Sequence, residues 1–428
     1  MEIVLSIFVV TICLVCLLRN SSYLVACFLV FRILIPENVR FWGTGISINS
    51  MVVFFMLASL LIKKKIAYTK QDKKYVVTQS IFVVYCLLTL FLANCGNLQS
   101  QILVLLEFVY TQILPSIIAV LLLHNEKGIE FIDTSFLVAT IISCVYGIIT
   151  YFARNNIYIE ILAGKKVEDS VWKGYATYAT FISTTTFGYF LAIALPYALF
   201  LLFYSKSEKV KKAAKVAIPL MFIGVILCKK RSAFIAIASM VLMLVLLSPK
   251  TKKNINKVVI VVCVAIALLI VIRSVPGLEK LDNFVTASIR FWDDKAVDVG
   301  RGSLGSSMEL RIRQFMYPFI EIKRNYIFGH GFGWCTWYLD TYKLHPILYG
   351  FESIFATGIC ELGVLGFIVY PLWLFFLYRY CLNSRKLKTN IILICFLTYV
   401  VDIVASGMNY LFLFLILIVL MNKHQIEE

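Results

Sequence analysis

Long, uninterrupted runs of apolar residues are the feature that most constrains the fold of this chain. Runs of roughly 17 to 25 apolar residues can cross a ~30 Å hydrocarbon layer as helices, because a helix satisfies its own backbone hydrogen bonds there. We count twelve or thirteen such runs. The composition, with 61% hydrophobic and 15% charged residues, lies far outside the range of soluble domains. The sequence therefore predicts an all-α polytopic membrane protein with about 12–13 transmembrane helices.

The apolar runs cover most of the chain on either side of one long polar segment. The clearest are 46–62, 75–93, 102–123, 132–152, 187–204, 213–228, 232–247, 258–272 and 353–378, followed by two shorter runs at 391–406 and 410–421. Residues 2–18 and 21–35 form either two short spans or one broken crossing. We therefore divide the chain into transmembrane helices at 1–272, a long loop at 273–350, and C-terminal helices with a tail at 351–428.

Clusters of Lys and Arg predict which loops face the cytoplasm, because short basic loops stay inside during insertion. Four basic loops, at 63–74, 206–212, 250–257 and 379–388, agree with one another in parity. The segments at 94–101, 153–186, 229–231 and 273–350 then lie outside, and the C-terminus lies inside. The side of the N-terminus stays open, because it depends on whether residues 2–35 cross once or twice.

Most of the formal net charge of +17 is explained by these inner basic loops. No basic stripe lies on a soluble domain, which argues against nucleic-acid binding. Three cations are exceptions, because Lys229, Lys230 and Arg231 lie between two apolar runs on the predicted outer side. An anionic ligand at the outer face would account for them.

The long outer loop is predicted to be folded. It contains two of the four His residues, so it is the first place to look for extracytoplasmic chemistry. Apolar residues recur there at helical spacing and predict an amphipathic helix that either lies in the membrane interface or caps the bundle. They are Ile312, Phe315, Met316, Phe319 and Ile320. A glycine-rich turn at 329–333 follows, whose glycines permit positive φ and whose amides can cradle an anion.

The order of these features is more specific than any one of them. Arg231 begins an apolar run after a short outer hairpin, the glycine-rich turn and His345 follow in the long loop, and Glu361-Leu-Gly-x-x-Gly366 comes next. This order resembles the bacterial O-antigen ligase and polysaccharide polymerase superfamily of the Wzy and WaaL type. The resemblance covers roughly residues 187–366. Many members have Asn or Ser after the loop His, whereas Pro346 stands here.

The resemblance implies an enzyme that moves a glycan from an undecaprenyl pyrophosphate carrier to an acceptor hydroxyl on the outer face of the cytoplasmic membrane. It implies no nucleotide sugar, no cofactor and no essential metal. It also implies a multi-pass protein of the bacterial cytoplasmic (inner) membrane. The expected partners are the lipid-linked glycan donor and acceptor, membrane lipid and a chain-length regulator.

The resemblance also assigns candidate roles to residues. Arg231 would hold the pyrophosphate, since the planar guanidinium binds phosphate oxygens bidentately and keeps its charge. His345 is the candidate general base, with a hydrogen-bonding or anion-binding contact as its competing role. His330, inside the glycine-rich turn, is the alternative base from its position alone, since the family pattern usually has an apolar residue there. Further candidates for substrate contacts are Arg290, Arg301, Arg311, Arg313 and Glu352.

Three functions fit this pattern. The first is a polymerase that joins lipid-linked repeat units of a capsule, O-antigen or similar surface polysaccharide. The second is a ligase that transfers finished glycan to lipid A core or to protein, with the same residues and a different acceptor. The third is a lipid-linked oligosaccharide flippase or transporter, which is disfavoured because a transporter would be expected to carry paired internal repeats.

Overall fold

The computed structural model describes residues 2–62, 69–93, 95–123, 126–164, 175–247, 308–382, 389–408 and 410–426, together with the single positions 274, 279 and 282. Within these ranges the chain forms helices joined by turns, and no β-strand is present. The predicted all-α architecture is therefore confirmed.

Five helical stretches are long and apolar enough to cross a membrane. They are α1 (Glu2–Arg19), α4 (Lys70–Ala93), the continuous stretch Leu98–Leu122, Lys127–Ala153 within α7 (Glu126–Ala153), and α9 (Thr184–Tyr204). A bent pair, α17 (Ile354–Leu362) with α18 (Gly366–Cys381), is a sixth candidate. The predicted polytopic class is thus confirmed. The number of 12–13 spans stays a prediction, because the run 258–272 lies outside the described residues.

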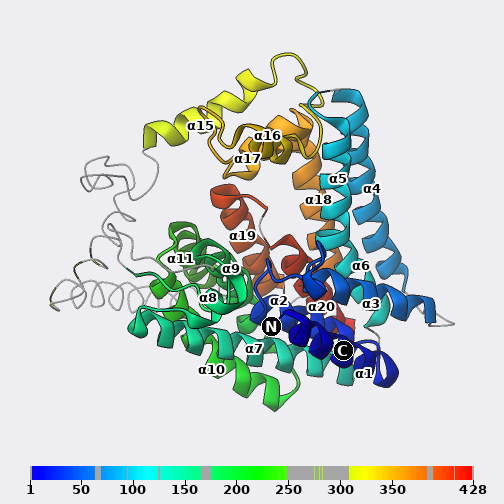
Figure 1. The fold of residues 1–428 in the computed structure, drawn as a ribbon, viewed down its shortest axis with the longest axis vertical. Helices are drawn as coiled ribbons and strands as arrows, with labels where there is room; N and C mark the ends of the chain where they lie inside the picture. The colour runs from blue at the N-terminus through cyan, green and yellow to red at the C-terminus, as the bar shows by residue number, and fades with distance from the viewer. Residues whose placement is uncertain are drawn as a thin grey trace.

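Shorter apolar helices complete the bundle. They are α2 (Tyr23–Leu34), α3 (Ile48–Ile62), α11 (Arg231–Leu246), α19 (Thr389–Ser406) and α20 (Leu411–Ile426), and α10 (Glu208–Cys228) packs among them. Helix α20 is buried over nearly its whole length and packs against α6 (Leu114–Leu122), α7, α9 and α18. In Figure 1 it lies between the upright helices α4, α5 (Leu98–Phe108) and α18 and the group α7–α11.

Polar side chains begin several of the helices, because the first amides of a helix have no partner within it and lipid supplies none. The Asn97 side chain accepts a hydrogen bond from the amide of Ser100 at the start of α5. Ser183 and Thr186 form a reciprocal capping box at the start of α9. The Ser353 hydroxyl accepts from the amide of Phe355 and begins α17. Local sequence therefore sets these three helix starts.

Residues 2–34 form a helical hairpin. The carboxylate of Glu2 accepts a hydrogen bond from the amide of Arg40 at 3.2 Å, and the Ser6 hydroxyl accepts one from the amide of Trp42 at 2.9 Å. The first turn of α1 therefore lies beside the residues that follow α2. Both ends of the hairpin share one side, which is the geometry expected of two crossings.

The run 353–378, predicted as one span, is broken into two helices. Helices α17 and α18 meet at a break with a bend of 117°. Gly363 ends α17 with φ +66°, a conformation that favours glycine. Its backbone packs so tightly against the outer loop that an added Cβ would collide with the carbonyl oxygen of Ile327. The bend is therefore held by a tertiary contact as well as by the glycine.

The glycine-rich turn of the outer loop fits into this break. Gly329 has φ +64°, and a Cβ placed on it would come within 2.6 Å of the Gly363 nitrogen. The amide of His330 donates to the carbonyl of Cys360 at 2.7 Å, and the amide of Val364 donates to the carbonyl of Tyr326 at 2.8 Å. Glycine is needed here because two stretches of backbone pack directly against each other.

The other side of the turn is held by the α4–α5 hairpin. The Gln101 side-chain amide donates to the carbonyl of His330 at 3.1 Å, and the amide of Phe332 donates to the Thr89 hydroxyl at 3.2 Å. The amides of His330 and Phe332 are thus bonded within the protein. The expected anion cradle is not formed by these two groups, and the turn has a docking role instead.

A buried ion pair fastens the C-terminal helix to α4. The Lys423 ammonium lies 2.9 and 3.0 Å from the two carboxylate oxygens of Asp72, and both residues are buried. The Tyr380 hydroxyl donates to the same carboxylate at 3.4 Å. Because charges in such a place are tolerated only with partners, this contact constrains how α4, α18 and α20 pack.

Replacing Gly329 by Ala should detach the turn from the α17–α18 break. The new methyl group meets backbone at an unfavourable φ, at a cost of about 1–3 kcal/mol. Cys335 is a free thiol that is only 3% exposed, and it should react at least about tenfold faster with a membrane-impermeant maleimide in the variant. The assay uses a Cys95→Ser background. Gly350→Ala is the matched control, because nothing lies within 4 Å of its added Cβ. Equal labelling of Cys335 in the two variants would refute the docking role of the turn.

Replacing Lys423 by Met should lower the thermal stability of the protein in detergent, because it leaves the buried Asp72 carboxylate without its cation. The expected loss is about 3–5 kcal/mol. The double variant Asp72→Asn/Lys423→Met removes both charges and should recover much of the loss. Lys211→Met, which breaks a surface pair with Glu208, should leave the melting temperature unchanged. A single variant that melts with the wild type would contradict this packing.

Candidate functional site

Three polar side chains of the outer loop lie together. Glu321 ends α15 (Met308–Glu321), His330 lies in the glycine-rich turn, and His345 lies in the turn before α17. The Nε2 atom of His330 is 3.8 Å from Oε1 of Glu321, and the Nε2 atom of His345 is 3.4 Å from Oε2. We call these residues the Glu321 cluster. Both histidines were predicted from the sequence, whereas Glu321 was missed as a site residue.

The ring of His345 is fixed by its own following residues. Its Nδ1 atom accepts hydrogen bonds from the amides of Ile347 at 3.1 Å and Leu348 at 2.9 Å. Pro346 has no amide hydrogen, and its fixed φ favours the turn that brings the next two amides under the ring. In the neutral ring the proton therefore sits on Nε2, the nitrogen that faces Glu321.

The segment that carries His345 holds three non-glycine residues with positive φ. These are Lys343 at +71°, Tyr349 at +47° and Phe351 at +50°. The backbone of His345 also exchanges two hydrogen bonds of 3.0 Å with that of Tyr349. Such backbone costs free energy and persists only where the surrounding structure holds it in place. The position of His345 is therefore rigidly specified.

Aromatic rings enclose the two histidines. The Trp334 ring centroid is 4.4 Å from that of His330, and the Tyr317, Tyr338 and Phe351 centroids are 5.3 to 5.6 Å from that of His345. Burial lowers the pKa of His330, and the nearby Glu321 carboxylate only partly opposes this effect. His330 is therefore neutral at pH 7.

Glu361 has a structural role. Its carboxylate is buried and accepts a hydrogen bond from the amide of Cys335 at 3.1 Å, in the first turn of α16 (Trp334–Tyr342). Gly333 precedes this helix and has no side chain with which to cap it. The Glu361 carboxylate therefore supplies a cap from α17, which joins the two helices.

The second group of site residues lies on the hairpin between α10 and α11. Helix α10 ends at Lys229, which has φ +50°, and α11 begins at Arg231, where the sequence placed the start of a span. The Lys229 ammonium lies 5.5 Å from the ring centroid of Tyr151, and that of Lys230 lies 5.6 Å from the ring centroid of Tyr189. Aromatic faces thus stabilise cations that lie close to apolar helices.

The C-terminal end of α19 contacts the cationic hairpin on one side and the start of α17 on the other. The Ser353 hydroxyl, next to Glu352, donates to the carbonyl of Val404 at 2.7 Å. The Tyr189 hydroxyl, which lies beside Lys230, donates to the carbonyl of Ser406 at 3.5 Å. The cationic hairpin and the end of the outer loop are therefore connected through the last turn of one helix.

The remaining predicted contacts are less well defined by the structure. Glu352 is exposed just before α17, and Arg313 is exposed on α15. Arg311 lies in α15, but its side chain is outside the described part of the chain, as are Arg290 and Arg301 altogether. The structure thus brings together His330 and His345, and it places Arg231 and Glu352 near the end of α19.

The amphipathic helix α15 was predicted either to cap the bundle or to lie in the membrane interface, and its two faces fit one role each. Phe315 and Phe319 pack against the rings of Phe355 and Phe367 at centroid distances of 5.3 and 5.8 Å, so the helix caps the α17–α18 pair. The side chains of Ile312, Met316 and Ile320 stay exposed. An exposed apolar row beside the bundle suits the membrane interface.

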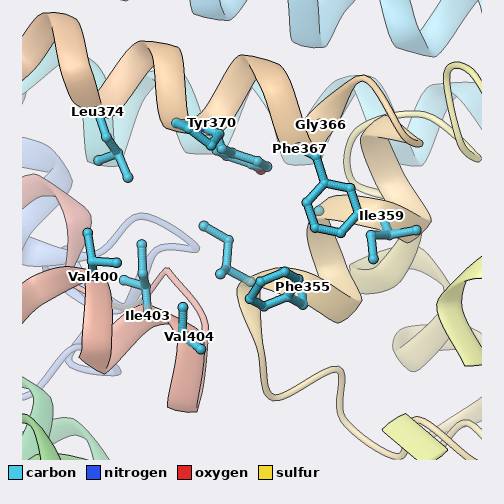
Figure 2. Close-up of a pocket in the computed structure, with 12 residues that line it drawn as sticks. Phe355, Ile359, Gly366, Phe367, Tyr370, Leu374, Val400, Ile403 and Val404 are labelled. Atoms are coloured by element: carbon cyan, nitrogen blue, oxygen red, sulfur yellow. The ribbon is translucent and has the colours of Figure 1, made fainter. Parts of the chain in front are cut away.

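Directly below these rings lies an apolar cavity of about 180 Å³ between α17, α18 and α19. Figure 2 shows Phe355, Ile359 and Phe367 at one end and Leu374, Val400 and Ile403 at the other. Its walls offer hydrocarbon and aromatic surface to a ligand. The contact of Phe355 and Phe367 with α15 connects it to the outer loop.

The comparison with protein families agrees with this layout. A family model described as O-antigen ligase matches residues 216–371. No curated protein matches the chain. The matched segment includes the cationic hairpin, the Glu321 cluster and the α17–α18 break, which are the features that carry the resemblance. Residues 216–371 therefore support the resemblance to the O-antigen ligase and polymerase superfamily of the Wzy and WaaL type, whose members process glycans in bacterial membranes.

Proposed function

We propose that this protein is a membrane glycan polymerase that joins undecaprenyl-pyrophosphate-linked oligosaccharide repeat units of a surface polysaccharide. The reaction takes place on the outer face of the cytoplasmic membrane. The observation that carries the proposal is the family match at residues 216–371, because it contains both the Arg231 hairpin and the Glu321 cluster. A chain-length regulator as a further partner belongs to the same proposal.

On the donor side, the pyrophosphate must leave with its negative charge. Arg231 begins α11 beside Lys230, and two of its guanidinium nitrogens, Nε and Nη2, are buried. A fixed cation in a place with little water stabilises a developing negative charge more strongly than an exposed one does. Arg231 would therefore hold the pyrophosphate as the bond to the sugar breaks.

On the acceptor side, a sugar hydroxyl must lose its proton as its oxygen attacks the anomeric carbon. The Glu321 cluster supplies titratable groups close together in a rigid part of the outer loop. Positioned groups of this kind contribute about 10²–10⁴-fold to a rate by proton transfer. The cluster would therefore take the proton.

A lipid-linked donor also needs an apolar surface close to the reacting centre. The cavity between α17, α18 and α19 offers such a surface under the outer loop. This suits a substrate whose head reacts at the membrane surface and whose tail stays in the bilayer.

A ligase that transfers finished glycan to lipid A core or to protein is the second candidate, favoured by the description of the matching family as O-antigen ligase. It would use the same groups on a different acceptor. The glycan products distinguish the two. Loss of a polymerase leaves single repeat units, whereas loss of a ligase leaves long chains on the lipid carrier.

Replacing Arg231 by Ala should abolish chain growth, because the leaving pyrophosphate loses its bidentate cation. We expect a fall in rate of about 100-fold or more. The variant is expressed in a strain that lacks the gene, and the surface glycan is separated on a gel. Single repeat units should replace the wild-type ladder. Arg231→Lys keeps the positive charge but lacks the planar guanidinium that binds two phosphate oxygens at once, so it should restore only part of the rate.

The matched control is Arg154→Ala, which removes an exposed Arg from the segment that follows α7. It should give the wild-type ladder at equal protein levels in the membrane. A normal ladder from Arg231→Ala would remove Arg231 from the site, and a ladder that persists without the gene would refute the polymerase.

A further inference from the structure

The polar contacts of the outer loop converge on Glu321. Its carboxylate lies between two imidazoles, with Oε1 3.8 Å from His330 and Oε2 3.4 Å from His345. The Glu321 side chain is 22% exposed, against 11% for His330 and 4% for His345. Of the three groups in the cluster, the carboxylate is thus the one that an acceptor sugar reaches most easily.

His345 is poorly arranged to accept a proton. The lone pair of Nδ1 already receives the amides of Ile347 and Leu348, and Nε2 carries the proton of the neutral ring. A general base needs a lone pair within hydrogen-bond reach of the proton that it removes. Instead, the protonated Nε2 side of the His345 ring faces Glu321, with Nε2 3.4 Å from Oε2.

His330 is harder for an acceptor to reach than Glu321 is. Its ring packs against the ring of Trp334 at 4.4 Å, and the residue is buried. An ionised carboxylate, by contrast, has about four lone-pair directions, and two imidazoles do not use all of them. The cluster also does not form a metal site, since no group of three His, Cys, Asp or Glu side chains in the described ranges is placed to hold an ion.

We propose that Glu321 is the general base of the transfer and that His345 is a positioning residue. The inference rests on the proposed function. The proton of the acceptor hydroxyl moves to a Glu321 carboxylate oxygen, and the hydroxyl oxygen forms a bond to the anomeric carbon. The bond from that carbon to the carrier pyrophosphate breaks, and the electron pair leaves with the pyrophosphate.

Other carboxylates near the loop are less suited. Glu361 is buried and caps α16 through the amide of Cys335. Glu352 is exposed outside the cluster, before α17, and is the competing base in the test below. The groups that face Glu321 are His330 from the glycine-rich turn, His345 from the turn before α17, and Tyr338 from α16.

The test begins with the rate of polymer formation by the full-length wild-type protein between pH 4.5 and 8. The substrate is membrane from a strain that lacks the gene and accumulates its own lipid-linked repeat units. A carboxylate base must be deprotonated, and a carboxylic acid is a stronger acid than an imidazolium, so the rate should stay level to a lower pH than an imidazole base would allow. An imidazole base would make the rate fall at the higher pH at which the ring gains its proton. That second result would overturn the inference, and this measurement needs no variant.

The variants then separate the roles. Glu321→Gln keeps the shape of the side chain but removes the base, so we expect a loss of about 10²–10⁴-fold, and Glu321→Asp should restore part of it. His345→Gln should reduce the rate less and leave the pH of the acid decline unchanged, because it disturbs only the orientation of Glu321. Asp340→Asn, which removes an exposed acid on α16, should match the wild type. Protection of Cys335 from maleimide verifies that each variant keeps the loop folded.

Failure of the inference and failure of the proposed function look different. If the wild type polymerises and Glu321→Gln does so at an equal rate, the inference is wrong and the function stands. If Glu352→Gln is inactive in place of Glu321→Gln, the base is Glu352 and the inference is again wrong. If the wild type makes no polymer from these membranes, the proposed function itself is wrong, and the role of Glu321 in it falls too.

Discussion

The outer loop meets the membrane bundle where one backbone packs directly on another, at Gly329 and Gly363. No side chain fits between them, so the turn and the break in the span adopt positive φ together. The amide of His330 then donates to the carbonyl of Cys360, and Glu361 of the same helix caps α16. The geometry of the Glu321 cluster therefore depends on this contact, because α16, α17 and His330 are all positioned by it.

The separation of charges on the outer face follows a chemical need. A carboxylate that pairs closely with Arg loses much of its ability to accept a proton, because the cation stabilises its charged form. Glu321 faces two histidines, and the cations of the α10–α11 hairpin lie instead against the aromatic rings of Tyr151 and Tyr189. In the proposed reaction, a fixed cation for the leaving group and a free base for the incoming hydroxyl can thus coexist on separate parts of the chain.

Much of this site was predictable, but the central residue was not. Motif order pointed to Arg231 and His345, the glycine-rich turn pointed to His330, and the structure places the two histidines around one carboxylate. Glu321 gave no signal, because a charged residue at the end of an amphipathic helix is ordinary. Its neighbours lie nine and 24 positions away in the sequence, and only the folding of the loop on the bundle brings them within reach.

The sequence by itself determined that the chain is a helical membrane protein, because long apolar runs leave the backbone no other way to satisfy its hydrogen bonds in lipid. It also indicated the family resemblance, through the order of a few residues and motifs along the chain. Tertiary structure decided that the run 353–378 bends and that the Nε2 atom of His345 faces Glu321. The bend depends on backbone groups supplied by another part of the chain. The orientation of the ring depends on how the loop folds around it. Neither feature can be predicted from the pattern of apolar residues.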